Sequence, residues 1–396
     1  MPYSVAVALR IVADENIPLA REAFGAFGDV VLAPGRRIDA RAVASADVLA
    51  VRSVTRIDER LLAGSRVRFV GTATIGTDHV DRAYLEQHGV AFAYAPGCNA
   101  RSVAEYVVAA LLELELDLTR SWQGATLGIV GVGNVGSRVA VLARALGMRV
   151  LECDPPRAER DPAFGSVPLE RVVAEADVIT CHVPMTRTGE HVTHHLLDAD
   201  AIARLRPGVV LFNSSRGGVI DDAALREACA AGRAHAVLDV WETEPDPRAA
   251  QLATVHFATP HVAGYSLDGK LAGTRMIAEA LQRFLDAGEA PDPALFDTPV
   301  AEPRIDLASG GRDGVRAAVR HSYAIRDDDQ RLRAALDAAG PAAADRGQAF
   351  DALRRDYPVR REFRSFVVEG AALGSEDRQV LGALGFGLAD DRTAGR

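Results

Sequence analysis

Three side chains late in the sequence have types that could carry acid–base chemistry, and each follows a short apolar run. They are Arg216, Glu244 and His261. An imidazole can accept a proton, a carboxylate beside it raises its basicity and fixes its orientation, and a guanidinium can bind a carboxylate in bidentate fashion. Together these groups suit the oxidation of an alcohol, which needs a base for the hydroxyl proton and a cation that polarises the oxygens.

Taken one at a time, these residues have simpler interpretations. A single histidine after a strand is more often structural than catalytic, and an arginine or a glutamate can equally be half of a surface ion pair. The structural interpretation also holds for the other histidines near strand ends and helix starts: His79, His182, His194, His195 and His256. His191, His194 and His195 could bind a metal, but no cysteine or carboxylate spacing supports them, so we predict no metal site.

A glycine-rich turn follows another apolar run and could hold a phosphate-containing cofactor. Gly131, Gly133 and Gly136 fit the pattern G-x-G-x-x-G, with a strand-like run before them and a helix-like run, 137–146, after them. The first glycine permits the tight turn, the second lets the backbone approach a pyrophosphate, and the third lets helix and strand pack closely. The helix N-terminus adds free N–H groups and a partial positive charge. This pattern predicts a dinucleotide-binding βαβ unit.

The next strand-like run, 149–153, delivers an acidic residue. Asp154 lies 154 − 131 = 23 residues after Gly131. A spacing of about 20 residues is typical of the carboxylate that bonds the ribose 2′-hydroxyl of a dinucleotide. Because a carboxylate there repels a 2′-phosphate, Asp154 predicts NAD rather than NADP as the cofactor.

Strand-like and helix-like runs alternate along most of the chain, which predicts an α/β protein with parallel sheets and ligands at the carboxyl ends of the strands. We expect two doubly wound, Rossmann-like domains followed by a C-terminal α+β segment. A mostly apolar helix over 102–118 is expected to pack between domains or against a partner subunit. The other expected elements are strands at 5–13, 30–33, 48–51, 90–93, 178–184, 209–213, 236–239, 255–259 and 363–369, and helices at 18–27, 40–46, 137–146, 266–285, 331–339 and 376–384.

Length and composition limit the classes of function. A chain of 396 residues suggests two or three domains, and 48% apolar with 25% charged residues is typical of a globular protein. A net charge of −9 argues against a nucleic acid or an acidic membrane as partner. The four cysteines are scattered, as expected in a reducing compartment. No signal peptide or membrane-spanning run is found, so we expect a cytoplasmic protein.

Several motifs together resemble a known family. The glycine-rich unit, Asn213 to Gly217, Asp239 to Pro245 and Pro260 to Gly264 resemble, in that order, motifs of the D-isomer-specific 2-hydroxyacid dehydrogenases. Six further stretches are similar to a branch of that family with a phosphorylated substrate: 12–18, 51–55, 69–81, 95–100, 153–157 and 261–265. The resemblance is specific over about 11–286 and weaker towards the C-terminus.

The resemblance implies roles for individual residues. Arg216, Glu244 and His261 are the expected catalytic set, with His261 as the acid and base. Ser53, Thr74 and Tyr265 are expected to contact a small phosphorylated 2-hydroxy acid, and Arg52 is our own hypothesis for the partner of its phosphate. The expected NAD-binding residues are Gly131, Gly133, Asn134, Val135, Gly136, Asp154, Val183, Ser214, Asp239 and Gly264.

The resemblance also implies a domain organisation. Residues 1–101 with 266–290 would bind substrate, 102–265 would form the NAD-binding Rossmann domain, and 291–396 would form a dimerisation domain of a homodimer. Two alternatives stay open at this point. One is another member of the family, such as a 3-phosphoglycerate dehydrogenase. The other is an NAD-sensing binding module of the same fold with negligible turnover.

Overall fold

The computed structural model describes residues 9–286, 291–299 and 303–389. The chain divides into two compact units, one made of Met1–Asn99 and Ser266–Pro299 and the other of Ala100–Tyr265 and Val300–Arg396. The C-terminal residues therefore belong to the same compact unit as the glycine-rich turn. The finer division into three domains stays a prediction.

The first unit contains a five-stranded parallel sheet in the order β2-β1-β3-β4-β5. Strands β3 and β4 are buried throughout, and the long helix α12 packs on β4 and β5. The elements are β1 (Leu9–Asp14), α1 (Ala20–Phe24), β2 (Gly28–Ala33), α2 (Ala40–Val43), β3 (Val48–Val51), α3 (Glu59–Leu62), β4 (Phe69–Thr72), α4 (Arg82–Gln87), β5 (Ala91–Tyr94) and α12 (Leu267–Leu285).

The second unit contains a six-stranded parallel sheet in the order β11-β10-β9-β8-β6-β7. The strand order reverses beside β6, so the carboxyl ends of β6 and β8 flank the crevice where such sheets bind ligands. The elements are α5 (Ala100–Asp117), β6 (Thr126–Val130), α6 (Asn134–Ala145), β7 (Arg149–Cys153), α7 (Pro155–Arg160), α8 (Leu169–Glu175), β8 (Val178–Cys181), α9 (Ala199–Ala203), β9 (Val209–Asn213), α10 (Asp222–Ala230), β10 (Ala234–Leu238), α11 (Ala249–Leu252) and β11 (Phe257–Ala258).

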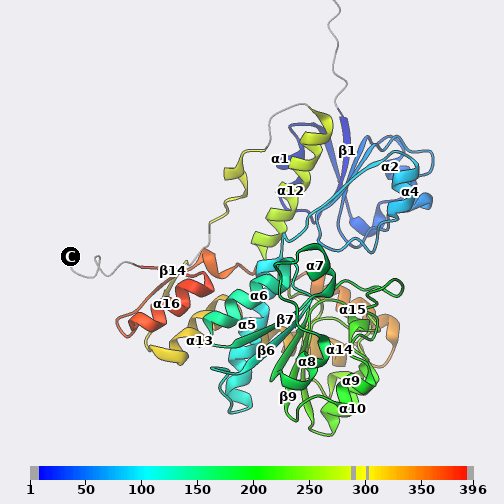
Figure 1. Cartoon of the computed structure of the whole chain (residues 1–396). Coiled ribbons are helices and arrows are strands. Elements are labelled where there is room, and N and C mark those ends of the chain that lie inside the picture. The colour runs from blue at the N-terminus through cyan, green and yellow to red at the C-terminus, as the bar shows by residue number, and fades with distance from the viewer. Residues whose placement is uncertain (1–8, 287–290, 300–302, 390–396) are drawn as a thin grey trace, which may run out of the picture. The chain divides into compact units, whose positions relative to one another are not determined.

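Residues 303–389, here called the C-terminal segment, add a small parallel sheet in the order β12-β13-β14 and four helices. Helix α13 packs on α5, α16 packs on α6, and α14 lies against β11 (Figure 1). The elements are β12 (Arg304–Asp306), α13 (Gly311–Ser322), α14 (Ile325–Ala339), α15 (Ala343–Arg355), β13 (Val367–Glu369), α16 (Ser375–Leu384) and β14 (Gly387–Leu388).

The predicted α/β class with parallel sheets is confirmed, and the differences lie at the ends of elements. The strand expected over 5–13 begins at Leu9 in the described part of the chain, and its residues 5–8 lie outside that part. The helix expected over 18–27 is shorter, because Leu19 has a left-handed backbone with φ 56°. The strand expected over 363–369 starts with a 3-10 turn and becomes extended only at Val367.

Helix α5 is buried along nearly its whole length within the second unit and carries three acidic residues towards its C-terminal end. Glu115 accepts hydrogen bonds from both Arg312 and Arg316 of α13, and Glu113 accepts from Arg320 and Arg326. These ion pairs join α5 to the C-terminal segment. Buried carboxylates are tolerated only when they are paired in this way.

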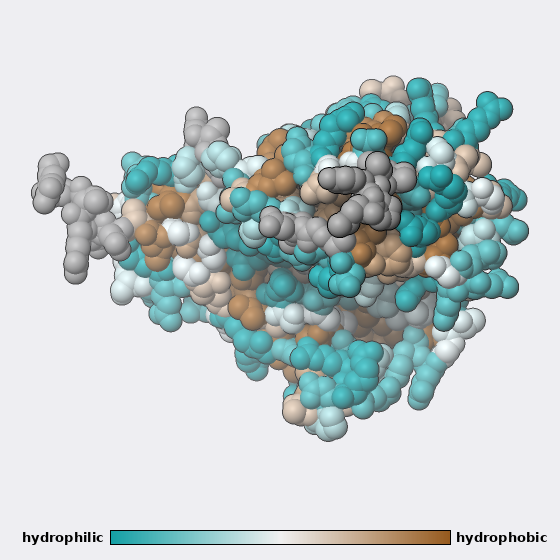
Figure 2. Space-filling view, turned by 90° about the horizontal axis from the view of Figure 1, so that it is seen from above, coloured by the Kyte–Doolittle hydropathy of each residue, from teal (hydrophilic) through white to brown (hydrophobic). Residues whose placement is uncertain are grey.

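The face seen in Figure 2 is mainly hydrophilic, with hydrophobic residues in separate patches. Among the described residues, no helix combines the length and the apolar character that crossing a membrane requires.

The ion pairs of Arg316 allow a matched test of this packing. Its Nη2 lies 3.3 Å from the nearly buried carboxylate of Glu115, whereas its Nη1 pairs with Asp313, whose side chain is 79% exposed. We expect Glu115→Ala to lower the free energy of unfolding by about 3 kcal/mol, because it removes the nearly buried carboxylate that pairs with both Arg312 and Arg316. Asp313→Ala should cost at most about 1 kcal/mol. Urea unfolding of both variants checks this, and equal losses would contradict it.

Candidate active site

His261 and Glu244 form a hydrogen-bonded pair in the second unit. His261 Nδ1 lies 2.9 Å from Glu244 Oε2, and both side chains are partly exposed, at 31% and 26%. The second carboxylate oxygen, Oε1, accepts the backbone N–H of Trp241 at 2.9 Å. The pair therefore has a fixed orientation and keeps access to a ligand.

The charge state of Glu244 decides which nitrogen of His261 is the base. Burial by itself would raise the pKa of Glu244, but the charge of His261, hydrogen bonds from His261 and Trp241, and the charge of Arg354 hold that pKa below its usual value. An ionised carboxylate only accepts hydrogen bonds, so Nδ1 of His261 carries the proton. Nε2 is then the nitrogen that can take a proton from a substrate.

A buried carboxylate, that of Asp239, holds the loop that carries His261. Its Oδ1 accepts the hydroxyl of Thr259 at 2.6 Å and the N–H of Val262 at 2.7 Å, and its Oδ2 accepts the N–H of Ala263 at 2.9 Å. His261 itself has a left-handed backbone with φ 58°, a conformation that side chains other than glycine rarely adopt. Asp239 thus stabilises an uncommon backbone conformation at the residue expected to act as the base.

Arg216 follows β9, as the sequence predicted, in a loop that contacts the one after β10. Asn213 donates from Nδ2 to the carbonyl of Arg216 at 2.8 Å, while its Oδ1 accepts from the N–H and the hydroxyl of Ser215. A Cβ on Gly217 would lie 2.1 Å from the carbonyl of Trp241, so only glycine permits this approach. The loop with the expected cation and the loop with Glu244 are therefore packed together.

The glycine-rich turn has the geometry that a dinucleotide needs. Gly131 has φ 87°, and a Cβ there would collide with the carbonyl of His182 and the side chain of Val183. A Cβ on Gly136 would lie 2.1 Å from the carbonyl of Gly131, whereas nothing lies within 4 Å of one on Gly133. Gly133 precedes α6 without a side-chain cap, so the N–H groups of that helix, beginning at Asn134 and Val135, remain available to a phosphate.

Two further residues in this region bear on a cofactor. Asp154 accepts the N–H of Val132 at 2.8 Å through Oδ2 and the N–H of Arg157 at 3.0 Å through Oδ1, so it also braces the glycine-rich turn. The hydroxyl of Ser214 is buried and has no hydrogen-bond partner among the described residues. Such an orphaned buried group is costly unless a ligand satisfies it. Together with the glycine cradle, these residues fit NAD. Gly264 is partly exposed beside the His261 loop.

The expected substrate residues lie in both units. Arg52, Ser53 and Thr74 belong to the first unit, where Arg52 and Ser53 follow β3 and Thr74 follows β4. Thr74 Oγ1 is 2.8 Å from Thr72 Oγ1 and donates to the Gly76 carbonyl at 3.0 Å. Tyr265 belongs to the second unit. Their contacts with substrate stay predictions.

Sequence reasoning missed two cations. Arg354 of α15 lies with its Cζ 5.8 Å from the ring centroid of Tyr265. Lys270, the single lysine of the sequence, has a pKa lowered to about 8 by burial and, next, by the charge of Arg52. Lys270 stands in no recognisable motif, and Arg354 opens the stretch 354–361, which resembles the C-terminal domain of the family without implying a role in the site. The one signal in the sequence was that Lys270 is a lysine in a chain whose other basic residues are arginines and histidines.

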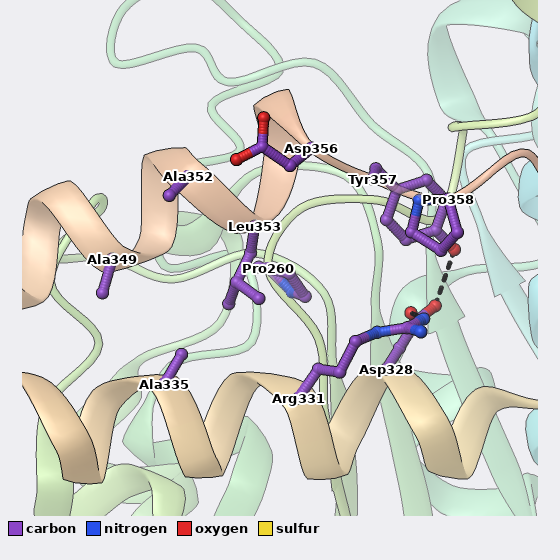
Figure 3. A pocket seen from close by; sticks show the side chains of 10 residues that line it. All are labelled: Pro260, Asp328, Arg331, Ala335, Ala349, Ala352, Leu353, Asp356, Tyr357 and Pro358. Atoms are coloured by element: carbon purple, nitrogen blue, oxygen red, sulfur yellow. Dashed lines mark hydrogen bonds and ion pairs between the residues drawn. The ribbon is translucent and has the colours of Figure 1, made fainter.

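A pocket opens between α14 and α15 in the second unit (Figure 3). Its volume is about 320 Å³, and its wall includes Pro260, the residue before His261, and Leu353, the residue before Arg354. Tyr357 donates to Asp328 at 2.7 Å along one side. None of the site residues expected from the sequence lines this pocket. Its wall nevertheless combines residues of the C-terminal segment with Pro260 of the loop that carries His261.

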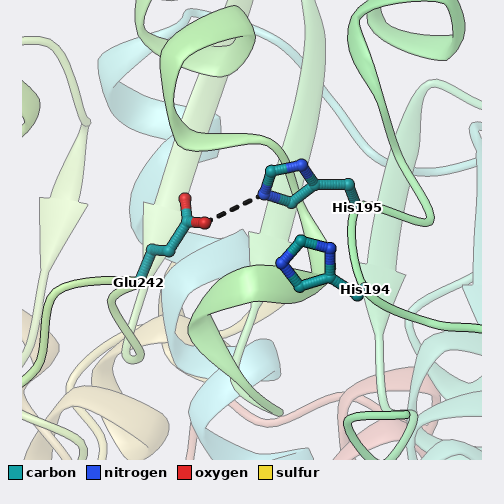
Figure 4. Close-up of side chains that lie close together, drawn as sticks. All are labelled: His194, His195 and Glu242. Atoms are coloured by element: carbon teal, nitrogen blue, oxygen red, sulfur yellow. Dashed lines mark hydrogen bonds and ion pairs between the residues drawn. The ribbon is translucent and has the colours of Figure 1, made fainter. Parts of the chain in front are cut away.

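Figure 4 shows a cluster of side chains of the metal-ligating kind. Ligand atoms of His194, His195 and Glu242 lie within 4.8 Å of one another, and His195 Nε2 is 2.9 Å from Glu242 Oε1. Glu159, Glu190 and His191 form a second, more exposed cluster. The histidine–glutamate hydrogen bond accounts for the first cluster without an ion, so the absence of a metal site stays a prediction.

Comparisons with protein-family models give two matches. Residues 101–263 match "D-isomer specific 2-hydroxyacid dehydrogenase, NAD binding domain". Residues 303–385, which make up most of the C-terminal segment, match a domain of unknown function, DUF3410.

Curated relatives match nearly the whole chain. Erythronate-4-phosphate dehydrogenase of Azotobacter vinelandii is 46% identical over 95% of this chain and 99% of its own, and that of Salinibacter ruber is 47% identical over 94% and 97%. Among solved structures, D-lactate dehydrogenase of Aquifex aeolicus with NAD and lactic acid covers 70% of this chain and 95% of its own, with a TM-score of 0.57 and 25% identity. NAD-bound 3-phosphoglycerate dehydrogenase of Entamoeba histolytica covers 70% and 96%, with a TM-score of 0.60 and 24% identity.

The loop after β10 offers a matched pair of glutamates for a test of the catalytic pair. Glu244→Gln keeps a hydrogen-bond acceptor for His261 but removes the charge that stabilises the protonated ring. We expect the variant to lower kcat by about 100-fold. Glu242→Gln, two residues earlier on the same loop and bonded to His195, should leave kcat unchanged. Steady-state NADH formation compares the two, and a Glu244→Gln enzyme with normal kcat would exclude the assigned role.

Proposed function

Because the chain belongs to the erythronate-4-phosphate dehydrogenase family, we propose that it oxidises 4-phospho-D-erythronate at C2 with NAD. The family, the fold and the NAD-dependent enzyme class predicted from the sequence are confirmed by these relatives and by the matching NAD-binding domain. The product of the proposed reaction is 2-oxo-3-hydroxy-4-phosphobutanoate, a step in the biosynthesis of pyridoxal 5′-phosphate (vitamin B6). The His261–Glu244 pair is the observation that carries this proposal.

In the proposed mechanism, Nε2 of His261 takes the proton of the C2 hydroxyl while the C–H bond at C2 breaks. Bound NAD supplies the acceptor for the hydride. Glu244 stabilises the imidazolium that forms, because its charge lies 2.9 Å from Nδ1. Arg216 binds the substrate carboxylate and polarises the C2 oxygen. One proton and one hydride leave the substrate, so the alcohol becomes a ketone and NADH is formed.

The cofactor would rest on the residues that fit it. The N–H groups at the start of α6 would bind the pyrophosphate, with Gly133 leaving room for it, and Asp154 would accept from the ribose hydroxyls. Ser214, with its orphaned hydroxyl, would donate to the cofactor. Val183, Asp239 and Gly264 complete the set proposed from the resemblance.

We propose that Arg52 and Lys270 bind the phosphate of the substrate. Both lie in the first unit, and α12, which carries Lys270, approaches the end of β4 closely. A Cβ on Gly273, one turn after Lys270, would lie 3.0 Å from the carbonyl of Ala73. Two neighbouring cations repel each other, and an anion bound between them offsets this repulsion. Ser53 and Thr74 follow the same strand ends and are proposed as neutral substrate contacts.

A homodimer formed through the C-terminal segment, in the cytoplasm, is proposed from the resemblance alone.

The proposed substrate can be tested by comparing the turnover of three related acids. We expect purified protein to form NADH with 4-phospho-D-erythronate and not with 3-phosphoglycerate or D-lactate, and His261→Ala to abolish this turnover. Activity with 3-phosphoglycerate alone would leave the family intact and exclude the proposed substrate. Tight NAD binding without turnover of any of the three would favour the binding module instead.

The pKa of Lys270 gives a test of phosphate binding. Since this pKa is lowered to about 8, Lys270 is protonated below pH 8 and loses its charge above it. We expect KM for the phosphorylated substrate to rise severalfold as the pH passes 8, whereas Lys270→Arg, which stays protonated, should keep KM nearly flat. Parallel KM–pH profiles of the two enzymes would refute the role of Lys270.

A further inference from the structure

The C-terminal segment contacts the catalytic loops from several sides within one compact unit. Arg346 donates from Nε to Asp246 at 2.7 Å, on the loop that carries Glu244. Arg360 donates from Nη1 to the carbonyl of Ala263 at 3.1 Å, on the loop that carries His261. Asp329 accepts the N–H of Ala258, the last residue of β11, at 2.8 Å. These contacts attach the segment to the two loops that carry the members of the catalytic pair.

Arg354 lies among these contacts, at the end of α15. Its Cζ is 5.8 Å from the ring centroid of Tyr265, and the ring of Tyr265 meets that of Tyr357 edge-on at 5.7 Å. Its Nε is buried and has no hydrogen-bond partner among the described residues. A guanidinium withdrawn from water in this way is expensive unless it acts on something nearby. Burial lowers the pKa of Arg354, whereas the charges of Tyr265 and Glu244 raise it.

The pocket in Figure 3 lies between α14 and α15 and is lined by Pro260 of the catalytic loop. Pro260 and Leu353 line the same cavity, and each is the immediate chain neighbour of a functional residue, His261 and Arg354 respectively. The end of α15 therefore lies next to the loop that carries His261, because both line this pocket. A substitution at Arg354 can therefore alter the position of the loop that carries His261.

We propose that Arg354 is a positioning residue for the reaction, which fixes Tyr265 for the substrate and holds a positive charge beside Glu244. The C-terminal segment, whose family model has no assigned function, is thereby part of the active site. This inference rests on the proposed function for its substrate. It does not require Arg354 to touch the reacting atoms.

The charge of Arg354 is expected to change the pKa of Glu244 in a defined direction. The charged groups facing Glu244 are His261, from the loop after β11, and Arg354, from α15, and Arg354 itself is faced by Asp351 of its own helix. Both cations lower the pKa of Glu244. Loss of Arg354 raises that pKa, so Glu244 becomes protonated at a higher pH and releases His261 earlier on acidification.

The experiment compares Arg354→Ala with Arg355→Ala in the full-length enzyme. Arg355 is the next residue of the helix, but its side chain is 64% exposed and pairs with Asp356. We expect Arg354→Ala to raise KM for 4-phospho-D-erythronate about tenfold, as for one lost polar contact, and to move the acid limb of kcat to higher pH. Arg354→Lys should restore the acid limb, because it keeps the charge. Arg355→Ala should match the wild type.

Two results would overturn the proposal. One is that Arg354→Ala behaves like Arg355→Ala. The other is that Arg354→Ala loses thermal stability while KM and the pH profile stay normal, which would make Arg354 a purely structural residue.

A readout without turnover separates this proposal from the proposed function. If the wild type fails to oxidise 4-phospho-D-erythronate, the function is wrong, but ¹³C NMR of protein labelled at the glutamate carboxyl carbons still follows the protonation of Glu244, assigned with Glu244→Gln. That signal should change at a higher pH in Arg354→Ala than in the wild type. Coincident titrations would overturn the proposal on their own.

Discussion

The carboxylate of Asp239 is the constraint on which the catalytic loop depends. It accepts three hydrogen bonds from the stretch 259–263 and is almost fully buried, at 1% exposure. Burial raises the pKa of this carboxyl, and the charge of His261 and the three donors oppose that rise. The left-handed backbone at His261 is held on its C-terminal side, because the N–H groups of Val262 and Ala263 both bond to this carboxylate. The carboxylate therefore sets the direction from which the imidazole meets Glu244.

Support for this loop extends beyond the parallel sheet. Tyr106 of α5 bonds the hydroxyl of Thr259 at 2.9 Å, and Arg360 of the C-terminal segment bonds the carbonyl of Ala263. Helix α5 is in turn joined to α13 by the ion pairs of Glu113 and Glu115. The site thus draws its rigidity from three parts of the chain that are far apart in sequence. Rigid elements of this kind hold reacting groups more accurately than loops alone.

The sequence alone predicted the features that depend on residues close together in the chain. The apolar runs predicted most strands, and the glycine pattern predicted a turn in which a Cβ on Gly131 or Gly136 would collide with backbone atoms. Motif order also identified Glu244 and His261, which the structure joins. Element ends were less predictable, since a left-handed residue such as Leu19 shortens a helix without a sequence signal.

Contacts between distant segments could not be predicted. Arg354 and Tyr265 are 89 positions apart, and their proximity depends on how α15 packs against the catalytic loop. That Asp239 lines the NAD site stays a prediction, whereas its hydrogen bonds to Thr259, Val262 and Ala263 were not expected from the sequence. The sequence contains the residue types, whereas the partner of each charged group is decided by tertiary packing.

The discontinuity of the first unit has a consequence for biosynthesis. Its sheet is made of residues before Asn99, but α12, which covers β4 and β5, follows 265 − 99 = 166 intervening residues. At about 5–20 residues per second, a ribosome needs roughly 8–33 s to make that insertion. During this interval the nascent sheet exposes apolar side chains that α12 later covers. The second unit also needs the C-terminal segment, so it cannot reach its final packing before residues 303–389 are made.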